Sequence, residues 1–217
     1  MTLKHLILIP THLEYLKLKG QVKAFDRSDV RVSICGFGPV AAAARAGMLI
    51  AEFQPGHVWN LGIAGSLSGQ ANVGESYTFA DVAMHGVGAG EGESHISAIE
   101  MEWHFWVGDT EDKLNQDAVI GSQLPLVGAS NNECGLLSVC AASASAEEAK
   151  RRNEKHPGVV AEDMESFGVA MACKLASVPL TVIRGISNVA GNRDIESWEV
   201  DSALAAVAEM ANGSLEA

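Results

Sequence analysis

The residues best suited to chemistry lie in one segment, residues 161–192, which combines clustered carboxylates with a later arginine and a side-chain amide. The residues concerned are Glu162, Asp163, Met164, Glu165, Arg184 and Asn188. Carboxylates can stabilise a developing cation or accept a proton, and an amide both donates and accepts hydrogen bonds. Acidic residues are also common where a helix begins, because they interact favourably with its dipole. Composition alone therefore favours a structural role for this cluster over a catalytic one.

Two glycine-rich runs could bind a phosphate or cover a pocket. The first, residues 36–44 (GFGPVAAAA), follows an expected strand and opens an expected helix, where free N–H groups bind anions. A dinucleotide site needs a third glycine, where Ala41 stands, and an acidic residue after the next strand, which ends instead in Asn60 and Leu61. We therefore expect no nicotinamide cofactor. The second run, residues 86–93 (GVGAGEGE), is typical of a flexible loop, or of a loop over a pocket.

Metal binding and nucleophilic catalysis by serine have no support in the sequence. The seven histidines include no H-x-x-x-H pair, and no cysteine and histidine have zinc spacing. The four cysteines form no C-x-x-C pair, which indicates buried, reduced thiols. No G-x-S-x-G motif is present. We expect neither a metal nor a cofactor.

The elements that must position these residues are short apolar strands that alternate with helices. The expected strands are residues 5–9, 31–35, 57–61, 76–84, 136–141 and 180–183. The expected helices begin near residue 12 and cover 40–53, 145–154, 164–176 and 199–211, with a turn at 62–66 and no readable pattern at 93–133. This alternation predicts an α/β protein, a three-layer αβα fold with a central mixed, largely parallel β-sheet. No repeat or linker appears, so we expect a single domain over residues 1–217.

Composition and charge exclude several classes of protein. Hydrophobic residues make up 47% of the chain, so a core can form without disulfides or a metal. The net charge is −12, and the only basic run is residues 150–152, whereas a nucleic-acid binder needs a basic surface. The apolar run at residues 6–9 is too short for a signal peptide, and no stretch could span a bilayer. We predict a cytoplasmic protein with neither a nucleic-acid nor a membrane partner.

Segment 161–192 resembles the signature of the methylthioadenosine/S-adenosylhomocysteine nucleosidases and their relatives in the nucleoside phosphorylase superfamily. That signature is a D/E-M-E helix start followed, about twenty residues later, by V-P-x-x-x-x-R-x-I-S-[D/N]. Residues 36–42 are similar to the family's G-x-G-x-x-x-A motif and residues 60–66 to its N-x-G-x-A-G turn, while strand 136–140 stands where a base-pocket strand is expected. Within the superfamily, the segments ILIPTHLE, CGFGPVAAAAR, GVGAGEGE, AEDMESFGVA and RGISN resemble the futalosine hydrolases. The resemblance implies hydrolysis of futalosine to hypoxanthine and dehypoxanthine futalosine, a step in one route to menaquinone.

The resemblance also implies catalytic roles. Glu165 would hold the ribose 2′- and 3′-hydroxyls and stabilise the cationic sugar, and Met164 would pack beneath it. Glu14 would orient and deprotonate the attacking water. An exposed first-turn glutamate is the alternative interpretation of Glu14, because the family has a run of acidic residues there and this chain has only THLEY.

The substrate-binding residues expected on the same grounds are Ala64, Gly65, Asp163, Met164, Arg184 and Ser143. Arg184 would orient Glu165 or Glu14 through a charge-assisted pair. Ala64 and Gly65 would offer backbone groups to the base or the sugar. Ser143, Ser145 and the loop at residues 86–93 are the candidates for holding the benzoate-bearing tail of futalosine.

Asn188 predicts which purine is bound, because adenosine-type nucleosidases have an aspartate at this place in the motif. Hypoxanthine presents O6 and N7, and an amide can donate to O6 while its carbonyl accepts from a protonated N7. A carboxylate facing O6 would oppose two acceptors, at a cost of about 1–3 kcal/mol. Asn188 therefore favours a 6-oxopurine. The alternative is an asparagine that only caps a turn.

Three other functions remain open. A purine nucleoside phosphorylase needs cationic and hydroxyl groups around phosphate, but the loop PTHLE has no arginine and Ile63 stands where a hydroxyl residue is expected. A methylthioadenosine/S-adenosylhomocysteine nucleosidase is disfavoured by Asn188. A nucleoside-binding protein on the same fold would keep the pocket without the water-activating glutamate. The expected partners are a nucleoside and water, and the resemblance implies a homo-oligomer in which a neighbour completes the pocket.

Overall fold

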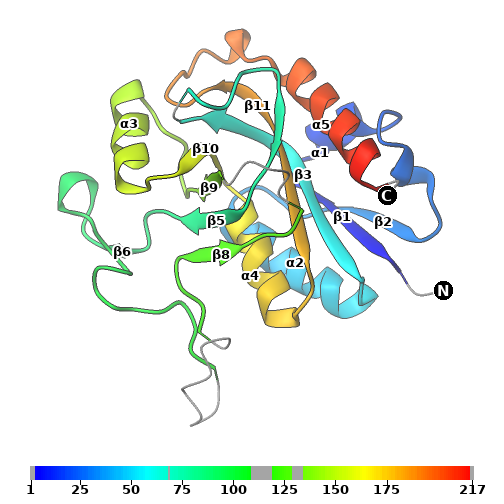
Figure 1. The fold of residues 1–217 in the computed structure, drawn as a ribbon, viewed down its shortest axis with the longest axis horizontal. Coiled ribbons are helices and arrows are strands. Elements are labelled where there is room, and N and C mark those ends of the chain that lie inside the picture. Colours follow the sequence, from blue (N-terminus) through cyan, green and yellow to red (C-terminus); the bar gives the residue numbers. More distant parts are fainter. Residues whose placement is uncertain (1–2, 68, 109–118, 129–133, 216–217) are drawn as a thin grey trace.

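The computed structural model of the chain describes residues 3–67, 69–108, 119–128 and 134–215. A mixed sheet of nine strands runs through the centre of this part of the molecule (Figure 1). The strands are β1 (His5–Ile9), β2 (Val30–Ile34), β3 (His57–Ser66), β4 (Ser76–Thr78), β5 (Asp81–Met84), β8 (Gln123–Pro125), β9 (Gly135–Ser138), β10 (Val159–Asp163) and β11 (Leu180–Val189). Two further short strands, β6 (Gly88–Ala89) and β7 (Ile96–Ser97), form a separate hairpin.

The strand order is β2-β1-β3-β10-β9-β5-β8, and β11 pairs with both β3 and β4. The pairs β1–β2, β1–β3, β3–β11, β9–β10 and β5–β9 are parallel. The pairs β3–β10, β4–β11 and β5–β8 are antiparallel. The prediction of a mixed, largely parallel sheet is confirmed.

Helices cover both faces of the sheet. They are α1 (His12–Leu18), α2 (Pro39–Phe53), α3 (Ala146–Lys155), α4 (Ser166–Ala176) and α5 (Val200–Leu215), with short 3-10 turns at Lys23–Asp26, Gly92–Ser94 and Ile195–Ser197. Successive residues of a strand point to opposite faces, and β1 shows this directly. Leu6 and Leu8 pack into the core beneath α2 and α4, whereas Ile7 and Ile9 pack against α1 and α5. The three-layer αβα architecture is therefore confirmed.

Helices α2 and α4 approach closely at a glycine. A Cβ atom on Gly168 would lie 2.3 Å from the carbonyl oxygen of Pro39, the first residue of α2. No side chain fits there, so Gly168 sets the distance between the two helices. This contact holds the beginning of α4 beside the beginning of α2.

The structure differs from the sequence-based expectation in several elements. Residues 62–66, expected as a turn, continue strand β3, because β10 and β11 pair with them from both sides. Residues 159–163 form β10, which was not expected, so the acidic cluster ends a strand and the helix begins only at Ser166. Expected strand 76–84 divides into β4 and β5, and β11 extends six residues beyond its expected end, to Val189. Leu13 and Leu16, expected as the apolar face of α1, are 60% and 54% exposed.

The remaining expectations concern residues 93–133, membrane-spanning helices and the number of domains. The stretch without a readable pattern, residues 93–133, contains β7 and β8, while residues 109–118 and 129–133 lie outside the described part. No helix among the described residues is long and apolar enough to cross a membrane. The single-domain organisation stays a prediction.

Candidate active site

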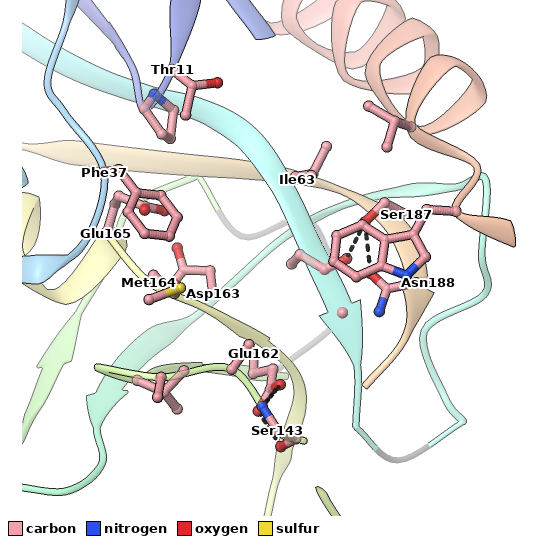
Figure 2. Close-up of a pocket in the computed structure, with 18 of the residues that line it drawn as sticks. Thr11, Phe37, Ile63, Ser143, Glu162, Asp163, Met164, Glu165, Ser187 and Asn188 are labelled. Atoms are coloured by element: carbon pink, nitrogen blue, oxygen red, sulfur yellow. Dashed lines mark hydrogen bonds between the residues drawn. The ribbon is translucent and has the colours of Figure 1, made fainter. Parts of the chain in front are cut away.

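A pocket of about 720 Å³ opens where the carboxyl ends of β1, β3, β9, β10 and β11 meet (Figure 2). In sheets of this kind, ligands bind at that edge because strand ends and loops leave a crevice there. The expected site residues that line the pocket are Glu14, Ala64, Gly65, Ser143, Asp163, Met164, Glu165 and Asn188. The fold thus brings together eight of the nine residues chosen from the sequence; Arg184 is the exception.

Glu14 is buried in the pocket wall, with 5% of its surface exposed. One carboxylate oxygen accepts hydrogen bonds from the N–H and the hydroxyl of Thr11, at 2.9 and 2.5 Å, and completes a capping box at the start of α1. The other oxygen accepts from the N–H of Ile63 at 3.1 Å. A Cβ atom on Gly62 would lie 2.8 Å from that oxygen, so the glycine makes room for the carboxylate. The alternative of an exposed first-turn glutamate is wrong.

Glu165 lies at the junction between β10 and α4 and is also 5% exposed. Its Oε1 accepts a hydrogen bond from the N–H of Gly38, the N-cap of α2, at 2.9 Å. Its Oε2 accepts no hydrogen bond from the described residues, which leaves that oxygen free for a ligand. Burial, with a smaller contribution from the neighbouring carboxylate of Asp163, raises the pKa of Glu165 to about 7. Burial also raises the pKa of Glu14.

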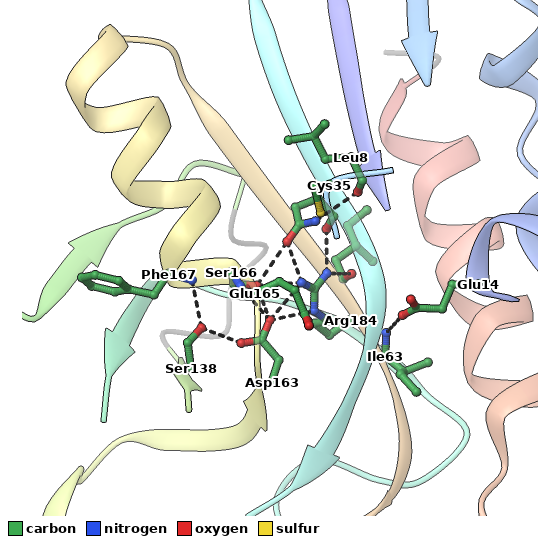
Figure 3. A network of polar contacts seen from close by, with 12 residues as sticks. Leu8, Glu14, Cys35, Ile63, Ser138, Asp163, Glu165, Ser166, Phe167 and Arg184 are labelled. Atoms are coloured by element: carbon green, nitrogen blue, oxygen red, sulfur yellow. Dashed lines mark hydrogen bonds and ion pairs between the residues drawn. The ribbon is translucent and has the colours of Figure 1, made fainter. Parts of the chain in front are cut away.

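A buried ion pair between Arg184 and Asp163 lies next to Glu165 (Figure 3). Arg184 is completely buried, and its Nε and Nη2 lie 3.0 and 2.9 Å from Oδ2 of Asp163. The same arginine donates to the side-chain and backbone oxygens of Asn60. Asp163 also accepts from the hydroxyl of Ser138 at 2.6 Å and from the N–H of Ser166 at 3.1 Å. The network ties β3, β9, β10 and β11 to the first residue of α4.

The expected role of Arg184 is therefore corrected. It pairs with Asp163 instead of Glu165 or Glu14, and it does not line the pocket. Its positive charge still lowers the pKa of Glu165 and of Glu14, against the larger opposing effect of burial. Asp163 reaches the pocket wall, but both of its oxygens are engaged by protein donors. Both residues instead hold the end of β10 against the start of α4, on either side of Glu165.

Asn188 lines the pocket near the end of β11 with its amide held in one orientation (Figure 2). The hydroxyl of Ser187 donates to Oδ1 of Asn188 at 2.8 Å, and Nδ2 of Asn188 donates to the carbonyl of Val189 at 2.9 Å. One N–H and one lone pair of the amide stay available to a ligand. Asn188 lies within a strand, so the alternative of a turn cap is wrong.

A second buried polar cluster, centred on Glu162, forms another part of the pocket wall. Glu162 accepts from the N–H and the hydroxyl of Ser143, at 2.7 and 2.8 Å, and from Arg152 of α3 at 3.0 Å. The hydroxyl of Ser143 in turn accepts from Arg152. Ser143 therefore lines the pocket with a hydroxyl that is already engaged, which argues against a primary role in holding a substrate tail. Neither Ser145 nor any residue of the loop 86–93 belongs to the described lining.

Sequence reasoning missed part of the lining. The additional residues include Thr11, Phe37, Arg193, Ile195 and Trp198. The T-x-x-E spacing of Thr11 and Glu14 was a detectable signal, because it is the signature of a capping box. Arg193 and Trp198 carried no signal, since they belong to a polar stretch without periodicity.

Comparison with known proteins identifies relatives. Residues 18–217 match the family described as the phosphorylase superfamily. A 5′-methylthioadenosine/S-adenosylhomocysteine nucleosidase of Colwellia psychrerythraea is 30% identical over 201 residues, which cover 90% of this chain and 80% of that protein. A futalosine hydrolase of Streptomyces coelicolor is 46% identical over 56 residues, only 26% of this chain and 24% of that protein. The solved futalosine hydrolase of Helicobacter pylori superposes with a TM-score of 0.76 over 100% of this chain and 98% of its own, at 16% identity.

Proposed function

Since the chain belongs to the phosphorylase superfamily and is a nucleosidase, we propose that its substrate is futalosine, which it hydrolyses to hypoxanthine and dehypoxanthine futalosine. The observation that carries this choice is the amide of Asn188, which the hydroxyl of Ser187 holds in place at 2.8 Å. With Oδ1 fixed, the free N–H of the amide donates to O6 of hypoxanthine. The remaining lone pair of Oδ1 accepts from N7–H of the departing base.

The two glutamates supply the rest of the chemistry. Cleavage of an N-ribosyl bond passes through an oxocarbenium-like state, which a carboxylate near the sugar stabilises. The free Oε2 of Glu165 accepts from the ribose hydroxyls, while Met164 supports the ring. A water that donates to the remaining lone pair of Oε1 of Glu14, the oxygen that accepts from Ile63, attacks the anomeric carbon and gives a proton to that carboxylate. The bond to N9 breaks, and the base leaves after N7 takes a proton from solvent.

Hydrolysis is favoured over phosphorolysis by the charge of the pocket. Arg152 and Arg184 pair with two of the lining carboxylates, Glu162 and Asp163, and the other two, Glu14 and Glu165, form no ion pair among the described residues and disfavour a phosphate ion beside them. Ile63 lies in the lining beside Glu14 and offers only an apolar side chain where a phosphate would need a hydroxyl or a cation.

We also propose that the chain forms a homo-oligomer. On helix α2, Val40 and Met48 are 81% and 63% exposed. Exposed apolar surfaces of this kind mark contact sites, and a second copy of the chain is the occupant we propose. Light scattering after gel filtration tests this, and a monomer at micromolar concentration would contradict it.

The substrate is tested by release of free base. The purified protein is incubated with futalosine, inosine and methylthioadenosine, with and without phosphate, and the products are separated by chromatography. We expect phosphate-independent release of hypoxanthine from futalosine. The Colwellia relative supports the alternative that the protein is a methylthioadenosine/S-adenosylhomocysteine nucleosidase. Release of adenine from methylthioadenosine, with no release of base from the other two nucleosides, would establish that alternative. Phosphate-dependent turnover would indicate a phosphorylase, and absence of turnover a binding protein.

A further inference from the structure

One cation lies in a pocket that is otherwise acidic. The charged residues among the described lining are Glu14, Glu162, Asp163, Glu165 and Arg193. Arg193 is exposed, and it forms no ion pair within the described part of the chain. An arginine that has no ion-pair partner among the described residues, at the mouth of a binding pocket, is available to a ligand anion.

The loop that carries Arg193 is well supported. The guanidinium carbon of Arg193 lies 5.8 Å from the centre of the Trp198 ring, within range of a cation–π contact. The indole N–H donates to the carbonyl of Asn192 at 3.2 Å. The N–H of Glu199, the next residue, donates to the carbonyl of Ser187 at 2.8 Å. The arginine is thus anchored to the strand end that also presents Asn188.

The same mouth has an apolar rim. Its members in the lining are Leu13, Phe37, Ile195, Trp198 and Val200. Leu13, Phe37 and Ile195 are 60%, 67% and 68% exposed, although a side chain of this kind gains free energy when a ligand covers it. The mouth therefore offers apolar surface next to a single positive charge.

The orientation of a bound nucleoside determines what reaches this mouth. With the base edge at Asn188 and the 2′- and 3′-hydroxyls at Glu165, the 5′ carbon is the position that can carry a substituent without removing these contacts. We propose that Arg193 binds a carboxylate at the end of an apolar 5′ substituent, and that it thereby determines specificity for nucleosides with such a tail. This inference rests on the proposed function, because the anchor points are those of the proposed reaction.

The test compares futalosine with its methyl ester, which lacks the negative charge, and with inosine, which lacks the tail. We expect Arg193→Gln to lower kcat/KM for futalosine about tenfold, to the value for the ester, because one charge-assisted contact is lost. Hydrolysis of inosine should stay unchanged, and Arg193→Lys should restore part of the loss. The matched control is Arg31→Gln, which removes an arginine that lies 5.2 Å from the ring centre of Phe53 and outside the pocket.

The outcomes separate this inference from the proposed function. Equal use of futalosine and its ester by the wild type, or an equal effect of Arg193→Gln on both, overturns the inference while hydrolysis of futalosine stands. Arginine-dependent preference for inosine 5′-monophosphate would also overturn it, in favour of a phosphate site. If the protein hydrolyses only adenine nucleosides, the same comparison is made with 5′-(3-carboxyphenylthio)-5′-deoxyadenosine and its methyl ester in place of futalosine and its methyl ester. If the protein hydrolyses no nucleoside, calorimetry measures the affinity of the wild type and of Arg193→Gln for futalosine and for its methyl ester. We then expect tighter binding of futalosine than of the ester by the wild type only, and equal affinities overturn the inference.

Discussion

Glu165 accepts a hydrogen bond from the backbone N–H of Gly38 at 2.9 Å, although the two residues are 127 positions apart. The contact places the carboxylate at the beginning of α2, where the helix dipole favours negative charge. Its position depends on the close approach of α2 and α4 at Gly168. The most important carboxylate of the proposed reaction is thus held by helix packing.

The first prediction concerns the charge of Glu165. We expect Glu165→Gln to lower kcat by about 10²–10³, because an electrostatic stabiliser of the cationic transition state is lost. The amide oxygen of glutamine can still accept from Gly38, so the fold should be retained, as circular dichroism can verify. The control is Glu147→Gln, since the side chain of Glu147 is 81% exposed on α3. Activity within a factor of three of wild type would remove Glu165 from the reaction.

The second prediction concerns pH. Because the pKa of Glu165 is raised to about 7, the carboxylate loses its charge as the pH falls through that value. We expect kcat/KM, which reports the free enzyme, to fall about tenfold for each pH unit below 7 and to level off above it. The raised pKa of Glu14 would make the fall steeper at lower pH. A profile that is flat between pH 5 and 8 would show that no essential carboxylate titrates in this range, which would contradict the raised pKa of Glu165 as a determinant of activity.

The third prediction concerns the base. We expect Asn188→Asp to lower kcat/KM for futalosine and inosine by roughly 10–100-fold, since a carboxylate facing O6 leaves two acceptors opposed. Activity on methylthioadenosine should rise slightly, because the carboxylate can accept from the adenine amino group. The ratio of the two specificity constants is the measurement. An unchanged ratio would show that residue 188 does not contact the base.

The fourth prediction concerns helix packing. We expect Gly168→Ala to destabilise the protein by about 1–3 kcal/mol, because its Cβ would lie 2.3 Å from the carbonyl of Pro39 and force α2 away from α4. Gly213→Ala in α5 is the matched control, since a Cβ there meets no atom within 4 Å. That change should stabilise the helix by about 0.5–1 kcal/mol. Urea unfolding measures both, and equal effects would refute the packing argument.

Local sequence signals predicted the elements that they specify. The run HLILI before Pro10 predicted β1, and the bounds agree with the structure. Strand β10 was not predicted, because its residues VVAED end in carboxylates and its pairing with β9 and β3 involves residues far away in sequence. The glycines of residues 62–66 indicated a turn, and this prediction failed for a similar reason. The segment is extended only because its partner strands, which are distant in sequence, pair with it.

The sequence by itself determined the fold class, the order of most elements and eight of the residues that line the pocket. Short-range periodicity, capping residues and a distinctive motif are all encoded locally. The tertiary structure decided how the charges pair. Arg184 faces Asp163 instead of Glu165 because β11 and β10 both pair with the end of β3, which brings the two side chains within 2.9 Å. Glu14 is buried because β3 passes beside α1 at Gly62 and Ile63, a contact that no local pattern specifies.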